Sequence, residues 1–184
     1  MIQVVFETHS WSEDNEQGVA SGWNHSRLSP RGRALARELG QRRADGLAAV
    51  FSSDLRRAAE TAEIAFSGTA TPVLLDWRLR ECDFGEGNGK PAMAPGAGGG
   101  RFLDDPHLGG ESWRQAIRRV GCFLGDLPLR WDEKSVLVIG HLATWRAMEH
   151  YLDGVPIEEL VGAHFAWQEG WEYLLDPEEA SAWR

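Results

Sequence analysis

Hydrophobic positions along the chain form short continuous runs that alternate with stretches of helical spacing. Three apolar runs predict buried strands, at residues 2–6, 47–51 and 136–139. Elsewhere, apolar residues recur three or four positions apart, which is typical of amphipathic helices. The predicted helices run from Ser29 to about residue 44, over 55–66, from Ser112 to about 124, and from His141 to about 153. A last apolar run at 171–175 indicates an edge strand.

Strands that alternate with helices predict an α/β fold, a three-layer sandwich with a mainly parallel central sheet. We expect one domain over residues 1–184, with the glycine- and proline-rich residues 85–110 as a loop or lid within it. In such sheets the ligand lies beyond the C-terminal ends of the strands. His9, the Ser52-Ser53 pair and His141 each follow a predicted strand closely. The three should therefore lie along one edge of the sheet.

Composition narrows the range of partners. The chain has 184 residues and a formal net charge of −9, which argues against nucleic-acid binding because that needs a basic face. We see no signal peptide and no apolar stretch of membrane-spanning length, so no membrane partner is expected. Cys82 and Cys122 are too few for a disulfide framework or a cysteine zinc site. We therefore expect a cytoplasmic protein without a metal centre.

Two histidines, an arginine and a carboxylic acid stand out as a possible set for phosphoryl transfer. His9 and His141 come from different strand ends, Arg57 follows the second strand, and Glu81 lies in a later irregular segment. A neutral imidazole can attack phosphorus, and an arginine-lined pocket suits the charged intermediate. A glutamic acid can protonate the leaving oxygen.

Six segments, in order along nearly the whole chain, give this set a context: THSWSEDN, SGWNHSRLSPRG, FSSDLRRAAETAEIA, LRECDFGEGNG, GGESW and VLVIGHLATWRAM. With these segments the chain resembles the histidine phosphatase superfamily, in its phosphoglycerate-mutase-like branch. The resemblance implies the fold of that branch. It implies neither a metal nor an organic cofactor.

Carried over position by position, the resemblance implies a role for each residue of the set. His9 becomes the phosphohistidine, and Arg57 grips the phosphoryl oxygens. Glu81 donates a proton and later activates water, while His141 stabilises the phosphoryl group in the transition state. The implied substrate-binding residues are Thr8, Ser10, Asn15, Ser21, Gly22 and Trp23.

Thr8 departs from the family pattern, which has an arginine directly before the nucleophilic histidine. Ser10 likewise replaces the family's glycine. Threonine cannot offer the planar fork with which arginine binds phosphate oxygens. Three interpretations follow: another arginine replaces the missing one, the substrate is less charged, or the protein is a weak or inactive phosphatase. The candidate replacements are Arg27, Arg80 and Arg101. The presence of all four other site residues favours the first two interpretations.

The sequence therefore predicts a metal-independent phosphatase that hydrolyses a small phosphate monoester through a phosphohistidine at His9. A phosphoglycerate-mutase-type phosphoryl transferase is less favoured, because the region 89–109 is short and glycine-rich and leaves the site open to water. The third alternative is a non-catalytic or altered-chemistry member that binds a small anionic ligand, with Thr8 as its support. The expected partner is a small phosphorylated molecule. The oligomeric state is open, with a homodimer as one hypothesis.

Overall fold

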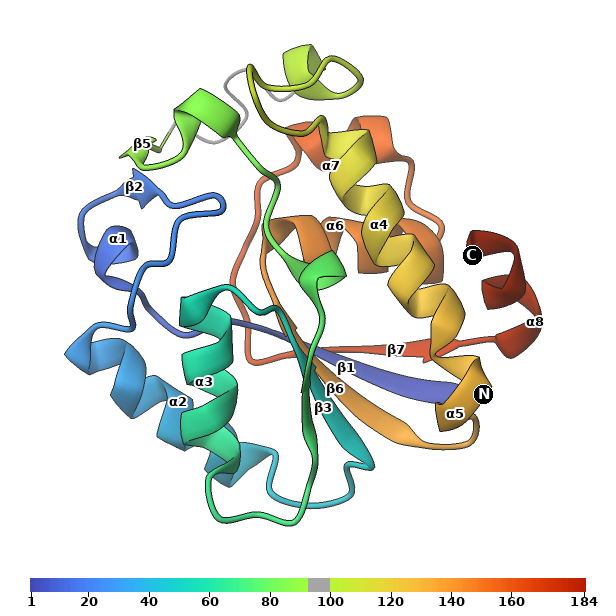
Figure 1. Cartoon of the computed structure of the whole chain (residues 1–184). Helices are drawn as coiled ribbons and strands as arrows, with labels where there is room; N and C mark the ends of the chain where they lie inside the picture. The colour runs from blue at the N-terminus through green and yellow to red at the C-terminus, as the bar shows by residue number, and fades with distance from the viewer. Residues whose placement is uncertain (93–99) are drawn as a thin grey trace.

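The computed structural model describes residues 1–92 and 100–184, and a five-stranded sheet forms its centre (Figure 1). The strand order is β4 (Val73–Leu75), β3 (Ala49–Ser52), β6 (Ser135–Gly140), β1 (Ile2–Thr8) and β7 (Trp171–Leu175). The first four strands are parallel, and β7 pairs antiparallel with β1 at the edge. This confirms the mainly parallel sheet and the edge strand that the sequence predicts.

Helices cover both faces of the sheet and complete the three layers. Figure 1 shows α2 (Pro30–Arg42) and α3 (Arg56–Phe66) on one face, and α4 (Trp113–Asp126) and α6 (Leu142–Leu152) on the other. Each face has its own hydrophobic cluster. Because side chains alternate along a strand, the even positions of β1 from residue 2 to residue 6 pack toward α4 and α6, and residue 5 packs toward α2 and α3.

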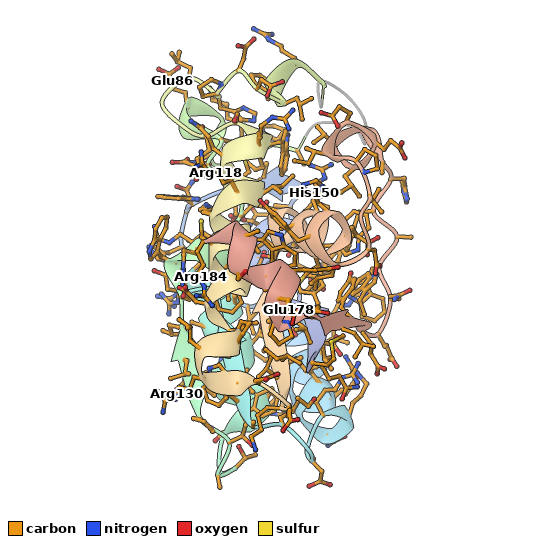
Figure 2. The ribbon with its side chains drawn as sticks, turned by 90° about the vertical axis from the view of Figure 1, so that its right-hand side faces the viewer. Glu86, Arg118, Arg130, His150, Glu178 and Arg184 are labelled. Atoms are coloured by element: carbon orange, nitrogen blue, oxygen red, sulfur yellow. The ribbon has the colours of Figure 1, made fainter. Side chains whose placement is uncertain are left out.

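Short elements connect and extend these layers. They are α1 (Glu13–Glu16), β2 (Val19–Ala20), η1 (Trp77–Leu79), η2 (Gly85–Gly87), β5 (Lys90–Pro91), η3 (Gly100–Phe102), α5 (Pro128–Trp131), α7 (Ile157–Gly162), α8 (Pro177–Ala180) and η4 (Ser181–Trp183). Figure 2 shows the C-terminal segment lying over α4, where Arg184 Nε donates to the Gly125 carbonyl at 2.8 Å.

Capping side chains explain where the main helices begin. Ser29 Oγ accepts from the Gly32 backbone N–H at 3.1 Å at the start of α2, where Pro30 occupies the first turn. Ser112 and Gln115 form a reciprocal capping box at the start of α4. Both starts agree with the sequence prediction. The first helix ends at residue 42, slightly earlier than predicted.

The irregular regions differ most from the sequence prediction. The predicted strand 47–51 is displaced to Ala49–Ser52. Upstream of Glu81, the short edge strand β4 pairs with β3, and it was not among the predicted strands. Within 85–110, β5 pairs with β2. The loop or lid predicted for that region falls partly on residues 93–99, which lie outside the described residues.

Strand register brings the ends of three strands level. Thr8 pairs with Gly140 across β1 and β6, and Ser52 pairs with Ile139 across β3 and β6. The residues that follow these strands therefore emerge at the same edge of the sheet, as the sequence predicts. Within residues 1–92 and 100–184, no helix has the length and apolar character that crossing a membrane requires.

Candidate active site

His9 is held as a neutral imidazole with a lone pair on Nε2. Its Nδ1 lies 2.7 Å from the Ser10 carbonyl, and because a carbonyl only accepts, Nδ1 carries the proton. Nε2 accepts from Arg57 Nε at 3.2 Å. Burial, and then the Arg57 charge, lower the pKa of His9 from 6.5 to about 3, while the bond to Ser10 acts in the opposite direction. The ring is thus uncharged at neutral pH and has a nucleophilic nitrogen.

Arg57 connects the two histidines to a backbone loop. From the first turn of α3, its Nη2 lies 3.3 Å from His141 Nδ1 and donates to the Gly22 carbonyl at 2.9 Å. Its Nη1 donates to the Asn24 carbonyl at 3.0 Å. Arg57 as a whole is only 2% exposed. The structure therefore brings His9, Arg57 and His141 into one hydrogen-bonded group.

His141 presents a donor that has no partner among the described residues. It follows β6 directly, and its ring centroid lies 4.9 Å from that of His9. Because Arg57 donates to Nδ1, the neutral ring carries its proton on Nε2, which is buried and unpaired in the part of the chain described. Burial, and then the charges of Arg57 and His9, lower the pKa of His141 well below 6.5. An oxygen of a bound ligand would satisfy this N–H.

Glu81 adjoins the histidines through the N-terminus of α6. Its Oε1 accepts from the backbone N–H groups of Cys82 at 2.8 Å and Ala143 at 3.1 Å, and its Oε2 accepts from Leu142 at 3.2 Å. These donors and the helix dipole stabilise the carboxylate. Burial lowers the pKa of Arg57, and the Glu81 carboxylate is near enough to act against that shift.

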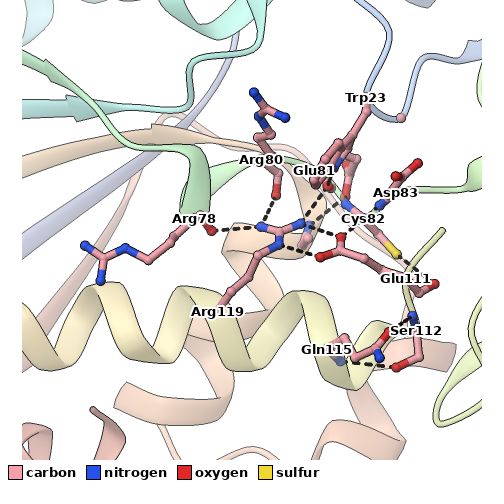
Figure 3. Close-up of polar contacts among 12 residues, drawn as sticks. Trp23, Arg78, Arg80, Glu81, Cys82, Asp83, Glu111, Ser112, Gln115 and Arg119 are labelled. Atoms are coloured by element: carbon pink, nitrogen blue, oxygen red, sulfur yellow. Dashed lines mark hydrogen bonds and ion pairs between the residues drawn. The ribbon is translucent and has the colours of Figure 1, made fainter.

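The Glu81 segment is fixed by a buried arginine that sequence reasoning missed. Arg119 on α4 donates from Nη1 to the carbonyls of Arg78 at 2.8 Å and Arg80 at 2.7 Å, and from Nη2 to that of Glu81 at 2.7 Å (Figure 3). Its Nε and Nη2 also bind both carboxylate oxygens of Glu111, at 2.9 and 2.8 Å. Arg119, Glu111 and the three carbonyls bound by Arg119 are together called the Arg119 clamp. A hydrophobic helix face gives no sign of such a residue.

Thr8 and Glu7 point to opposite sides of β1. Glu7 is buried and pairs with Arg42 at 3.1 Å and Arg43 at 3.0 Å, on the α2 side. The Thr8 hydroxyl instead accepts from the Trp167 indole Nε1 at 3.2 Å. The negative charge of Glu7, two residues before His9, is therefore neutralised on the face of β1 opposite the Thr8 side chain. Trp167 is a second residue that sequence reasoning missed.

Ser10 and Asn15 are engaged in local structure. The Ser10 backbone N–H donates to Thr61 Oγ1 at 3.0 Å, which anchors the His9 loop to α3. Asn15 forms a reciprocal capping box with Ser12 at the start of α1, where its Oδ1 accepts from the Ser12 backbone N–H at 2.9 Å. The amide oxygen of Asn15 is thus used within its own helix, and the amide nitrogen is the group it can offer a ligand.

The predicted substrate-binding residues 21–23 form a loop that contacts Arg57 and Glu81. The Ser21 carbonyl accepts from the Asn24 N–H at 2.9 Å. Gly22 has φ +51°, and a Cβ there would collide with the Asn88 side chain. Trp23 Nε1 donates to the Glu81 carbonyl at 2.7 Å. This loop therefore holds Arg57 on one side and Glu81 on the other.

The three arginines proposed as replacements have other partners or places. Arg80 binds Asp54 through two hydrogen bonds of 2.7 and 2.6 Å. Arg27 is exposed and lines a polar cavity of about 370 Å³. Arg101 is exposed and lies over the Phe102 ring at 5.2 Å. In the described part of the chain, none of the three is hydrogen-bonded to either histidine.

Arg146 on α6 is a further buried arginine that the sequence analysis did not single out. Its guanidinium lies 4.1 Å from the centre of the Trp113 ring, and Nη2 donates to the Val161 carbonyl at 3.0 Å. It packs between α6, α4 and α7. Burial lowers its pKa, and the Glu81 carboxylate acts in the opposite direction.

Comparison with known proteins places this geometry in a family. The model of the histidine phosphatase superfamily (branch 1) matches residues 6–169. The chain is 29% identical over 168 residues to phosphoserine phosphatase 1 of Hydrogenobacter thermophilus, covering 86% of this chain and 80% of that protein. It is 31% identical over 175 residues to the 2,3-bisphosphoglycerate-dependent phosphoglycerate mutase of Methylobacterium sp. (strain 4-46), covering 86% and 84%.

A solved structure agrees with these relatives. The mycobacterial glucosyl-3-phosphoglycerate phosphatase, in a complex with VO3, matches with a TM-score of 0.73 at 27% identity, covering 86% of this chain and 85% of that one. The family match includes the segments that contain His9, Arg57, Glu81 and His141. This chain therefore belongs to the histidine phosphatase superfamily, branch 1.

Proposed function

We propose that this chain is a metal-independent phosphatase that hydrolyses a small phosphate monoester through a phosphohistidine at His9. The observation that carries the proposal is the state of the His9 ring: neutral, with the Nε2 lone pair next to Arg57 and the His141 ring. An imidazole in that state is a nucleophile without further activation. Family membership and the phosphatases among the similar proteins support the same conclusion.

The first half-reaction forms a bond from His9 Nε2 to phosphorus and breaks the bond from phosphorus to the alcohol oxygen. Arg57 Nε, which donates to His9 Nε2 in the ligand-free protein, would transfer its hydrogen bond to a phosphoryl oxygen. The unpaired Nε2–H of His141 would donate to another phosphoryl oxygen. Both donors are positioned before the ester arrives, so they stabilise the charge that builds up in the transition state.

Glu81 is the group that handles protons in the proposal. In the ligand-free protein its carboxylate holds three backbone N–H donors. In the first half-reaction Glu81 acts as the carboxylic acid. The protonated carboxyl then supplies the proton to the leaving alkoxide. In the second half-reaction the carboxylate removes a proton from water, which attacks phosphorus, breaks the bond to His9 and releases inorganic phosphate.

A mutase reaction is the second candidate, and the similarity to a phosphoglycerate mutase favours it. A mutase must hold a second phosphorylated group while the first is on the histidine, and each such group needs cationic donors. Among the described residues, Arg57 is the guanidinium hydrogen-bonded to the histidine pair. Hydrolysis, which needs water as the acceptor, therefore fits the site better.

The proposal is tested by replacing the nucleophile and its matched control. We expect the wild-type chain to hydrolyse 4-nitrophenyl phosphate in the presence of a chelator. After an alkaline quench, which preserves phosphohistidine, the mass of the chain should be higher by one phosphoryl group. His9→Ala should abolish both signals. His150→Ala is the control, because that ring lies near the C-terminal end of α6 and faces the Val155 carbonyl (Figure 2).

Three outcomes separate the candidate functions. Turnover that His9→Ala leaves intact would refute the nucleophilic role of His9. A wild-type chain that neither turns over nor becomes phosphorylated would support the anion-binding alternative. Transfer of the phosphoryl group to an added alcohol in preference to water would favour the mutase.

A further inference from the structure

We propose that Thr8 and Trp167 form a subsite for a flat apolar group on the alcohol side of the ester, so that the substrates are aryl or arylmethyl phosphates. We call these two residues the Thr8 subsite. The inference rests on the proposed phosphatase function and names the class of substrate for it. It begins from the contact between a threonine that adjoins the nucleophile and a tryptophan from the other end of the sequence.

The strand geometry places Thr8 on the side of the sheet that faces α6. Phe6, two residues earlier on β1, belongs to the cluster on that side and packs against Trp171 at 5.5 Å between ring centroids. Thr8 is the next residue on the same face, and it is level with Gly140, the residue before His141. Its hydroxyl accepts from Trp167 Nε1 at 3.2 Å. The Trp167 indole therefore contacts the residue that directly precedes His9 in the sequence.

Trp167 is exposed although the segment that carries it is well anchored. Phe165 packs edge-on against Trp145 at 5.1 Å and stacks on Trp171 at 5.5 Å. On the other side, Arg43 Nη2 donates to the Glu169 carbonyl at 3.5 Å. Trp167 itself is 60% exposed. A large aromatic ring that is tied by its N–H, and otherwise open to water, is available to bind an apolar surface.

The chemistry of this side is neutral and aromatic. Thr8 and Trp167 contribute no charge, whereas a second phosphate or carboxylate on the ligand would need cationic donors. A flat group that buries apolar area against Trp167 suits these walls better than an anionic group does.

A pair of esters that differ in the ring tests the inference. Benzyl phosphate and ethyl phosphate are both esters of primary alcohols with leaving groups of similar basicity, and only the first carries an aromatic face. Stacking of one ring on an aromatic side chain is worth enough to change affinity by about tenfold or more. We expect the wild-type chain to favour benzyl phosphate by at least about tenfold in kcat/KM.

Trp167→Ala should raise KM for benzyl phosphate by about tenfold and so remove most of the preference for benzyl phosphate over ethyl phosphate. Thr8→Val, which keeps the shape and removes the acceptor, should lower the preference less. Trp77→Ala is the matched control: that tryptophan is 53% exposed and follows β4, at the opposite edge of the sheet from β7. It should not change the ratio.

Each result has a definite meaning. Equal use of the two esters by the wild type, or equal loss for both in Trp167→Ala, would overturn the inference while the phosphatase function stands. Preference for an ester that carries a carboxylate on the ring over benzyl phosphate would also overturn it. No turnover of either ester and no phosphohistidine would instead refute the proposed function itself.

Discussion

Glu81 and Thr8 both adjoin the histidine pair, but the structure supports them in different ways. The Glu81 segment is held by three hydrogen bonds from the buried guanidinium of Arg119, which makes two more to the Glu111 carboxylate. The Thr8 side chain has one hydrogen bond of 3.2 Å, from a largely exposed tryptophan. A residue involved in proton transfer needs a fixed position, whereas a residue that contacts the variable part of a ligand does not.

The difference indicates which part of the site tolerates change. Removing one partner from a buried, fully hydrogen-bonded charge leaves the others unsatisfied, at a cost of about 3–5 kcal/mol. Removing one ordinary hydrogen bond near the surface costs about 0.5–1.5 kcal/mol. The Arg119 clamp should therefore be intolerant of substitution, and the Thr8 subsite should change its ligand preference without unfolding the protein.

Arg119→Ala is expected to have the largest effect. It removes the buried guanidinium from the Glu111 carboxylate and from three carbonyls, so the free energy of unfolding should fall by about 3–5 kcal/mol. Urea denaturation measures this loss. Arg118→Ala, on the exposed neighbour labelled in Figure 2, is the control and should change stability by less than about 0.5 kcal/mol.

Equal stability of the two variants would show that the clamp contributes nothing to the fold. Arg119→Lys separates position from charge, because lysine cannot span carbonyls and a carboxylate with one planar group. If the lysine variant folds but loses kcat with KM unchanged, Arg119 positions Glu81. Full activity in that variant would contradict a positioning role.

Thr8→Arg should have the next largest effect. It adds a planar cationic donor beside His9, and one preorganised donor is worth about 10² in rate, or about 2.7 kcal/mol. We expect kcat/KM for ethyl phosphate to rise by up to that factor. The preference for benzyl phosphate should fall, because the longer side chain displaces Trp167.

Thr8→Gln provides the neutral control of similar length and should not raise the rate. No change in Thr8→Arg, with stability retained, would mean that another arginine already supplies the missing charge when a ligand binds.

Arg57→Gln should raise the pKa of His9 from about 3 toward 6.5, although burial, the larger cause, keeps it below 6.5. Below pH 6.5 His9 becomes protonated in the unfolded chain, whereas in the folded chain it becomes protonated only near pH 3. Stability from this residue is therefore complete above pH 6.5 and is lost as the pH falls toward 3. NMR titration of the His9 ring, assigned with His9→Gln, measures the shift. An unchanged pKa would contradict the contact with Arg57.

Trp167→Phe should have the smallest effect. It removes the N–H bonded to Thr8 and keeps an aromatic ring, so stability should change by less than about 1.5 kcal/mol. About half of the benzyl preference or more should survive if the ring is the binding element. Loss of the whole preference would show instead that the hydrogen bond positions the ring.

The buried strands and the helix starts could be predicted because neighbouring residues determine them. The buried runs that became β1 and β6 are continuous and apolar, and each ends at a histidine, so strand and site residue could be recognised together. Ser29 and Ser112 mark helix starts because each side chain accepts a hydrogen bond from the backbone N–H three residues later. The family resemblance then assigned roles to residues that periodicity alone could not distinguish.

Long-range contacts were not predictable in this way. Thr8 and Trp167 are 159 positions apart, and no local signal links a threonine to a tryptophan in a distant loop. Arg119 was predicted only as part of a helix, because its role depends on carbonyls that another segment brings to it. Asn15 was assigned to substrate binding, and its amide oxygen also caps α1, a helix too short to be recognised from a hydrophobic pattern. The strands β2 and β5 are likewise too short to be recognised in this way.

The position of β1 in the sheet has a consequence for how the protein is made. This strand is translated before both of its neighbours, β6 and β7, which are encoded from Ser135 onward. His9 therefore has no sheet partner beside its strand until more than a hundred further residues have been made. Its partner histidine follows β6 directly, so the pair forms only when the sheet closes around β1. The histidine pair is thus assembled late in synthesis, together with the burial of β1.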